Sequence, residues 1–159
     1  MTRHCLRLAI LILLFSPALN AQCVSGGLAV IVNKANPVES LSMAQLRRLI
    51  LGDVRAWPDH KQVNLIARDQ ATKTFQCMIS GIVRQTVAEY HRYVINAEFR
   101  GDEPMTIQTA DSDATAAKFV AQSPGALSVV EANSVAAMGA NVKVVKVDGK
   151  SVGQPGYPL

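Results

Sequence analysis

The chain has 159 residues, 49% of them hydrophobic and 18% charged, and its 16 basic and 12 acidic side chains give a formal net charge of +4. No block of lysines and arginines is present, which argues against a nucleic-acid-binding protein. The length fits one small domain that buries its own hydrophobic core.

The N-terminal segment has the residue order of a secretory signal peptide. Arg3 and Arg7 precede an apolar run over residues 8–15, and small residues with a proline follow over residues 16–21. This order predicts a signal peptide over residues 1–21, cleaved after Ala21, and therefore an exported protein that is periplasmic or secreted. The alternatives are cleavage after Ala18, an uncleaved membrane anchor, and lipid modification of Cys23.

The predicted leader changes what the rest of the chain implies. Its apolar run is far shorter than the roughly 20 residues that span a bilayer, and no second run of that kind occurs, so we do not expect an integral membrane protein. The leader contains two arginines and no acid, which leaves 14 basic and 12 acidic residues in the mature domain, residues 22–159. A domain with so small a net charge does not create a strong electrostatic field.

Two of the three cysteines, Cys23 and Cys77, remain after removal of the leader. An even number of cysteines in an oxidising compartment favours a disulfide. Such a bridge would close a loop of about 55 residues and contribute on the order of 4 kcal/mol. The alternative is two unrelated thiols.

Strand-like and helix-like segments alternate along the mature domain. Short apolar runs predict strands, and apolar residues at three- and four-residue spacing predict helices. Ser42 and Ser112 can cap helices, Gly52 ends the first helix, and Asp148-Gly149 marks a turn. The alternation predicts an α/β layer fold with a largely parallel or mixed sheet. The expected strands are residues 28–32, 63–67, 126–130 and 142–147, and the expected helices are residues 43–51, 72–83, 86–97 and a segment after Ser112.

Several segments resemble, in the same order, motifs of the periplasmic phosphate-binding proteins of ABC transporters. Residues 41–59, a helix that ends at Gly52 before Trp57, are similar to that family's phenylalanine-leucine-glycine element and its following tryptophan. Residues 123–130, which begin Ser-Pro-Gly-Ala, are similar to the family's asparagine-proline-glycine-alanine strand entry. Arg68 matches a strand-ending arginine that precedes the family's second ligand loop. Further similar segments bring the resemblance to roughly residues 28–150: residues 30–37, 90–93 and 99–101.

The resemblance implies an α/β fold of the periplasmic-binding-protein-like (type 2) class, here as a single lobe with a mixed sheet flanked by helices. It also implies a solute-binding protein and not an enzyme. Its ligand would be phosphate or another small oxyanion, and its partner an ABC transporter permease. In a chain of this length we expect no counterpart of the family's N-terminal lobe.

The segment between Arg68 and Phe75 departs from the family pattern. It reads Asp-Gln-Ala-Thr-Lys-Thr and lacks the serine-glycine-threonine of the family's ligand loop. The shortened loop leaves a second hypothesis open, in which the domain is a one-lobe envelope interaction module that has lost ligand binding. One lobe encloses an anion only partly, so a homodimer across the open face is a further expectation.

The same segment still has residues that suit an anion. A strand ends at Arg68 and a helix begins near Thr72, so backbone N–H groups and the positive end of the helix dipole would face a ligand. Arg68 can bind an oxyanion with two parallel hydrogen bonds. Thr72 and Thr74 can donate from their hydroxyls, and Lys73 adds a positive charge. The alternative is that Thr72 only caps its helix and that Arg68 pairs with Asp69 or another surface acid.

Catalytic and metal-binding patterns are missing from the sequence. His60 and His91 are the only histidines after the leader, and neither has a partner at metal-ligand spacing. Cys77 with His91 would be a conceivable nucleophile pair, but no catalytic signature surrounds it. The acidic pairs Asp102-Glu103 and Asp111-x-Asp113 are more typical of helix starts and solvated loops than of a calcium site. We therefore expect no enzymatic activity, no cofactor and no metal.

Overall fold

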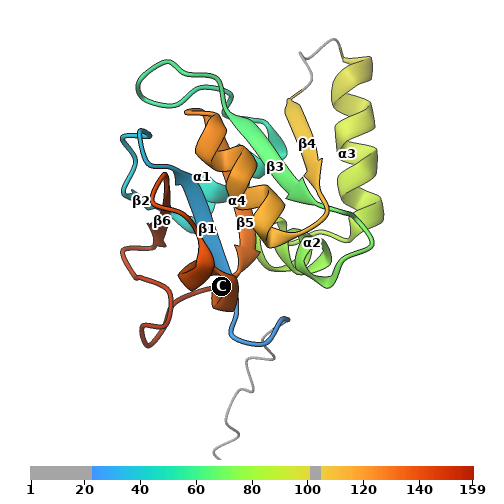
Figure 1. The fold of residues 1–159 in the computed structure, drawn as a ribbon. Helices are drawn as coiled ribbons and strands as arrows, with labels where there is room; N and C mark the ends of the chain where they lie inside the picture. Colours follow the sequence, from blue (N-terminus) through green and yellow to red (C-terminus); the bar gives the residue numbers. More distant parts are fainter. Residues whose placement is uncertain (1–22, 101–104) are drawn as a thin grey trace, which may run out of the picture.

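A computed structural model of the chain describes residues 23–100 and 105–159, so the predicted signal peptide and the Asp102-Glu103 pair lie outside the described residues. The described part is a mixed six-stranded sheet with helices on both faces (Figure 1). The strands are β1 Leu28–Asn33, β2 Ser40–Leu41, β3 Asn64–Arg68, β4 Thr106–Ala110, β5 Ala126–Glu131 and β6 Val142–Val147. The helices are α1 Met43–Leu51, α2 Lys73–Met78, α3 Val87–Phe99 and α4 Asp113–Gln122, with a π-helical turn η1 Ile79–Val83 and a 3-10 helix η2 Ala132–Ala137.

The strand directions place three strand ends at one edge of the sheet. The strand order is β2-β6-β1-β5-β3-β4, in which β3 is parallel to both β4 and β5 whereas β1 is antiparallel to β5 and β6. Ile66 pairs with Ser128, and Arg68 pairs with Ala110. Because β3, β4 and β5 run the same way, the residues that follow Arg68, Ala110 and Glu131 meet at the same edge.

Two apolar clusters lie on opposite faces of the sheet. Along β1, Val30 and Val32 belong to the cluster under α1, α2 and η1, whereas Ala29 and Ile31 belong to the cluster under α4. Every residue of β1 is buried. The continuous apolar run in the sequence therefore reflects a central strand that is covered on both sides.

Most of the predicted elements are confirmed, with shifts of one or two residues at their ends. Ser42 and Ser112 cap α1 and α4, and Gly52 ends α1 in the left-handed conformation at φ 79°. The predicted helix over residues 72–83 is two elements, because the α-helical pattern of α2 changes to the π-helical turn η1 at Ile79. The short strand β2 and the edge strand β4 were not predicted from the sequence.

The N-terminal end of the described chain is held by a disulfide. Cys23 is bonded to Cys77, with their Cα atoms 5.6 Å apart, and the two cysteines are 54 positions apart in sequence. Cys23 is exposed, whereas Cys77 is fully buried in α2. Because its sulfur is in this bond, Cys77 does not form the nucleophile pair with His91 that the sequence left open. Within the described residues, no helix is long and apolar enough to cross a membrane.

Candidate functional site

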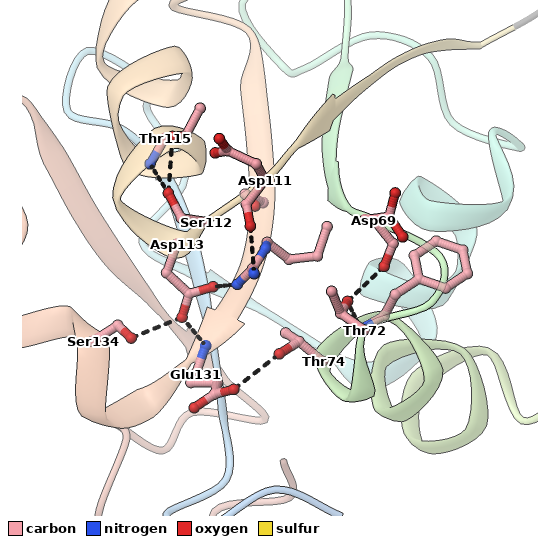
Figure 2. Close-up of polar contacts among 12 residues, drawn as sticks. Asp69, Thr72, Thr74, Asp111, Ser112, Asp113, Thr115, Glu131 and Ser134 are labelled. Carbon is pink, nitrogen blue, oxygen red and sulfur yellow. Dashed lines mark hydrogen bonds and ion pairs between the residues drawn. The ribbon is translucent and has the colours of Figure 1, made fainter.

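The carboxyl ends of β3, β4 and β5 bring together a cluster of polar side chains (Figure 2). Arg68 ends β3, the turn at Asp111 and Ser112 follows β4, and Glu131 ends β5. Ligands of open α/β sheets bind outside the carboxyl ends of their parallel strands. The side chains at these strand ends, those of Arg68, Asp111, Ser112 and Glu131 with their neighbours, are therefore the candidate site. We call them the carboxyl-end cluster.

The guanidinium group of Arg68 is engaged by the segment that begins α4. Its Nη1 forms an ion pair with Oδ1 of Asp113, and its Nη2 donates to the carbonyl oxygen of Asp111 at 2.9 Å. The two side chains of the ion pair are only 13% and 10% exposed. The Nε of Arg68 is buried and has no hydrogen-bond partner among the described residues. The sequence left open that Arg68 pairs with Asp69 or another surface acid. The acid that it meets is Asp113, which is not on the surface but 9% exposed.

The carboxylate of Asp113 accepts hydrogen bonds from three different elements. Its Oδ1 faces Arg68 on β3, while its Oδ2 accepts from the backbone N–H of Glu131 at 3.0 Å and from the hydroxyl of Ser134 at 2.7 Å (Figure 2). Asp113 is the first residue of α4, as expected of a helix-start acid, but it is 9% exposed and not a solvated loop residue. The sequence did not indicate its role in joining three strand ends.

Thr72 serves as the N-cap of α2. Its hydroxyl oxygen accepts from the backbone N–H of Phe75 at 3.3 Å, and its hydroxyl donates to the carbonyl oxygen of Asp69 at 2.5 Å. The carboxylate of Asp69 in turn accepts from the backbone N–H of Ala71 at 2.9 Å. The shortened loop after Arg68 is therefore closed by its own hydrogen bonds.

The other two predicted anion ligands lie in different environments. Thr74 is 2% exposed, and its hydroxyl donates to Oε1 of Glu131 at 3.1 Å, whereas Lys73 is exposed. The structure thus brings Arg68 and Thr74 to the carboxyl-end cluster through Asp113 and Glu131. It does not gather Arg68, Thr72, Lys73 and Thr74 around one point.

Oxygen atoms of acidic residues already engage the guanidinium of Arg68. Asp113 gives it a carboxylate and Asp111 gives it a backbone carbonyl oxygen, while the Glu131 carboxylate at the end of β5 accepts from Thr74. Side-chain hydrogen bonds from Thr115 and then Ser112 hold the pKa of Asp111 below its usual range, so this carboxylate stays ionised at neutral pH. An anion approaching Arg68 must overcome this negative field.

No metal centre is found in the part of the chain that the structure describes, where no group of three or more histidine, cysteine or acidic side chains could hold an ion. The two histidines of the described residues lie on other segments than the carboxyl-end cluster: His60 is in the loop before β3, and His91 is on α3 next to the ring of Tyr90. The chemistry that the cluster offers is hydrogen bonding and charge pairing around Arg68.

The sequence matches no protein-family model, and it has no significant match among curated proteins. Solved structures of phosphate-transport binding proteins are similar in fold. A phosphate transport receptor of Vibrio cholerae superposes with a TM-score of 0.61 at 19% identity, over 79% of this chain and 48% of that chain. A phosphate ABC transporter substrate-binding protein of Clostridium perfringens, solved with bound phosphate, superposes with a TM-score of 0.62 at 19% identity. The match covers 79% of this chain and 46% of that chain. PstS of Borrelia burgdorferi superposes with a TM-score of 0.63 at 10% identity, and the match covers 78% of this chain and 48% of that chain.

The chain spans about half the length of these neighbours. At such identities the similarity establishes the fold. The resemblance that the sequence motifs indicated is confirmed at that level: the structural neighbours of this chain are substrate-binding proteins of phosphate ABC transporters, with a mixed sheet flanked by helices.

Proposed function

We propose that the protein is an exported, non-enzymatic solute-binding protein that binds phosphate or another small oxyanion at the carboxyl-end cluster. The observation that supports this proposal is the position of Arg68, a guanidinium at the meeting point of three parallel strand ends, in a fold shared with phosphate-transport binding proteins. Export rests on the predicted signal peptide, residues 1–21. An ABC transporter permease is the natural recipient of the ligand.

The chemistry favours an oxyanion over other ligands. A guanidinium group binds tetrahedral and planar oxyanions through parallel charge-assisted hydrogen bonds, which are stronger than bonds between neutral groups. Around Arg68 the hydroxyl of Ser134 and the backbone N–H of Glu131 add two donors. An incoming oxyanion would share these donors with Asp113, so we expect binding weaker than a fully open site would give.

Calorimetric titration with phosphate tests the proposal. The protein is expressed with its own leader, purified after export and titrated with phosphate, with sulfate as the second anion. Arg68→Ala is expected to weaken phosphate binding by about tenfold or more, because hydrogen bonds to charged groups are lost. The control is Arg92→Ala, an exposed cation on α3 that should leave binding unchanged. Because Arg68→Ala also removes a buried ion pair, circular dichroism must show that the variant is folded, and Arg68→Lys serves as the milder substitution.

If the folded wild-type protein gives no heat of binding with either phosphate or sulfate, ligand binding is refuted. Equal affinity of the wild-type and Arg68→Ala proteins would refute the proposed site, since the bound anion would then lie elsewhere.

A second candidate function is an envelope interaction module, and one observation favours it. Among the residues that the structure describes, large apolar side chains are exposed at three positions, Ile95 at 50% and Phe99 at 86% on α3 and Ile107 at 40% on β4. Ile107 pairs in register with Leu65, whose cluster also contains Tyr90 of α3, so these residues lie on the same side of the sheet. β4 is an edge strand whose residues 106–109 are all exposed. Exposed apolar groups beside a sheet edge are typical of contact surfaces.

Substitution of the exposed aromatic residue tests this second function. If the surface is a contact between copies, sedimentation velocity should show concentration-dependent association of the wild-type protein, and Phe99→Ser should shift it to monomer because the apolar area that drives association is removed. Arg92→Ser on the same helix is the control. A wild-type protein that stays monomeric at high concentration would argue against a homodimer.

A further inference from the structure

The carboxylate of Asp113 is bound as a free oxyanion would be. It receives a guanidinium from β3, a backbone N–H from the end of β5 and a hydroxyl from η2. Combinations of arginine, backbone amide and hydroxyl donors are what proteins use to hold phosphate and carboxylate groups. The three partners, Glu131, Ser134 and Arg68, come from separate elements and lie 18 to 45 positions from Asp113 in sequence, so the arrangement belongs to the fold and not to a local turn.

We propose that Asp113 is a built-in ligand of the oxyanion site: its carboxylate occupies the position that an external oxyanion takes, and the two compete for Arg68, Ser134 and the Glu131 N–H. This inference rests on the proposed function and adds how the site is regulated. The contact is self-inhibitory, because the ligand must displace Asp113 before it gains the donors. The affinity of the protein is then set by the strength of this internal contact.

The structure provides room for the exchange. A groove of about 410 Å³ runs beside Asp113 between α4 and the segment that links η2 to β6. Asp113 and Ser134 line it together with small side chains such as Ala114 and Ala117, and Lys118 lies on its wall. In the proposed exchange the Asp113 carboxylate turns into this groove, and a small anion enters from it. Removal of the carboxylate would leave the space of one carboxylate group, which formate matches.

Substitutions of Asp113 and Arg68 test this competition. Asp113→Ala removes the ion-pair partner of the Arg68 guanidinium and creates a place for a carboxylate. Added formate is expected to raise the melting temperature of Asp113→Ala and leave that of the wild-type protein unchanged. The matched control is Asp111→Ala, because the side chain at 111 does not contact Arg68, which binds only the carbonyl oxygen of Asp111. Arg68→Ala combined with Asp113→Ala should abolish the response to formate.

Phosphate provides the second readout. Asp113→Ala is expected to bind phosphate about tenfold or more tightly than the wild-type protein, because a charged competitor for the donors is gone. If Asp113→Ala does not fold, Asp113→Asn keeps the shape of the side chain without its charge, and it should show the same tightening. Asp113→Ala that is folded but insensitive to formate, or Asp113→Asn with unchanged phosphate affinity, would overturn the inference.

The outcomes separate this inference from the proposed function. Phosphate binding by the Asp113 variants with none by the wild-type protein would support the built-in ligand and refute phosphate binding as the native function. If the wild-type protein binds phosphate in a way that depends on Arg68 but does not change with the residue at position 113, the proposed function is supported and the built-in ligand is refuted. If neither the wild-type protein nor any variant responds to formate or phosphate, both the proposed function and the built-in ligand are overturned.

Discussion

Cys23→Ser is expected to lower the free energy of unfolding by about 4 kcal/mol, because loss of the bridge to Cys77 frees a long loop in the unfolded chain. Cys23 is exposed, so the serine itself removes no buried contact. Urea unfolding followed by circular dichroism gives the difference. A reducing agent should bring the wild-type protein to the stability of Cys23→Ser and leave the variant unchanged.

A wild-type protein whose stability does not respond to reduction would contradict this expectation. It would mean that the contacts of residues 23–27 with the C-terminal segment, such as the close approach of Gly27 to Leu159, hold the N-terminal end without the disulfide.

Gly125→Ala is expected to destabilise the protein by about 3 kcal/mol, as overpacking in a closely packed interior does. A Cβ at position 125 would collide with the backbone carbonyl oxygen of Gln62. The same turn is fixed by the Gly125 carbonyl, which accepts from the indole N–H of Trp57 at 2.9 Å and from the backbone N–H of Asn64 at 3.0 Å. Any shift that relieves the collision therefore strains these two hydrogen bonds as well.

Gly139→Ala is the matched control for this prediction. A Cβ there meets nothing within 4 Å, and we expect a change within about 0.5 kcal/mol, typical of substitutions away from tight contacts. Urea unfolding of the two variants side by side is the measurement. Equal stabilities would show that the turn at Gly125 has room that the structure does not indicate.

The parts of the fold that the sequence could predict are those governed by local patterns. The apolar runs of β1 and β6 and the serine caps of α1 and α4 depend on neighbouring residues alone, and they were located to within one or two residues. β4 was missed because its residues Thr106–Thr109 are exposed on both faces, which leaves no alternation of apolar and polar residues to detect. β2 was missed because it has two residues and exists only through its pairing with β6.

The candidate site was predictable only in part, for a similar reason. Arg68 and the cap at Thr72 could be found in the sequence because a strand end and a helix start have local signals. The contact between Arg68 and Asp113 joins residues 45 positions apart, and it follows from β3 and β4 being parallel neighbours. The acidic pair at positions 111 and 113 was visible as a helix start, but nothing in a single sequence states which arginine it meets.

A crystal structure of the unaltered protein grown with phosphate decides whether an oxyanion binds at the carboxyl-end cluster. We expect a tetrahedral ion within about 3 Å of the Arg68 guanidinium and the Glu131 backbone N–H, at ordinary hydrogen-bond distances, with the Asp113 side chain turned into the groove beside α4. A structure in which Asp113 still binds Arg68, and no phosphate contacts that guanidinium at a saturating concentration, would contradict both the proposed site and the competition for it.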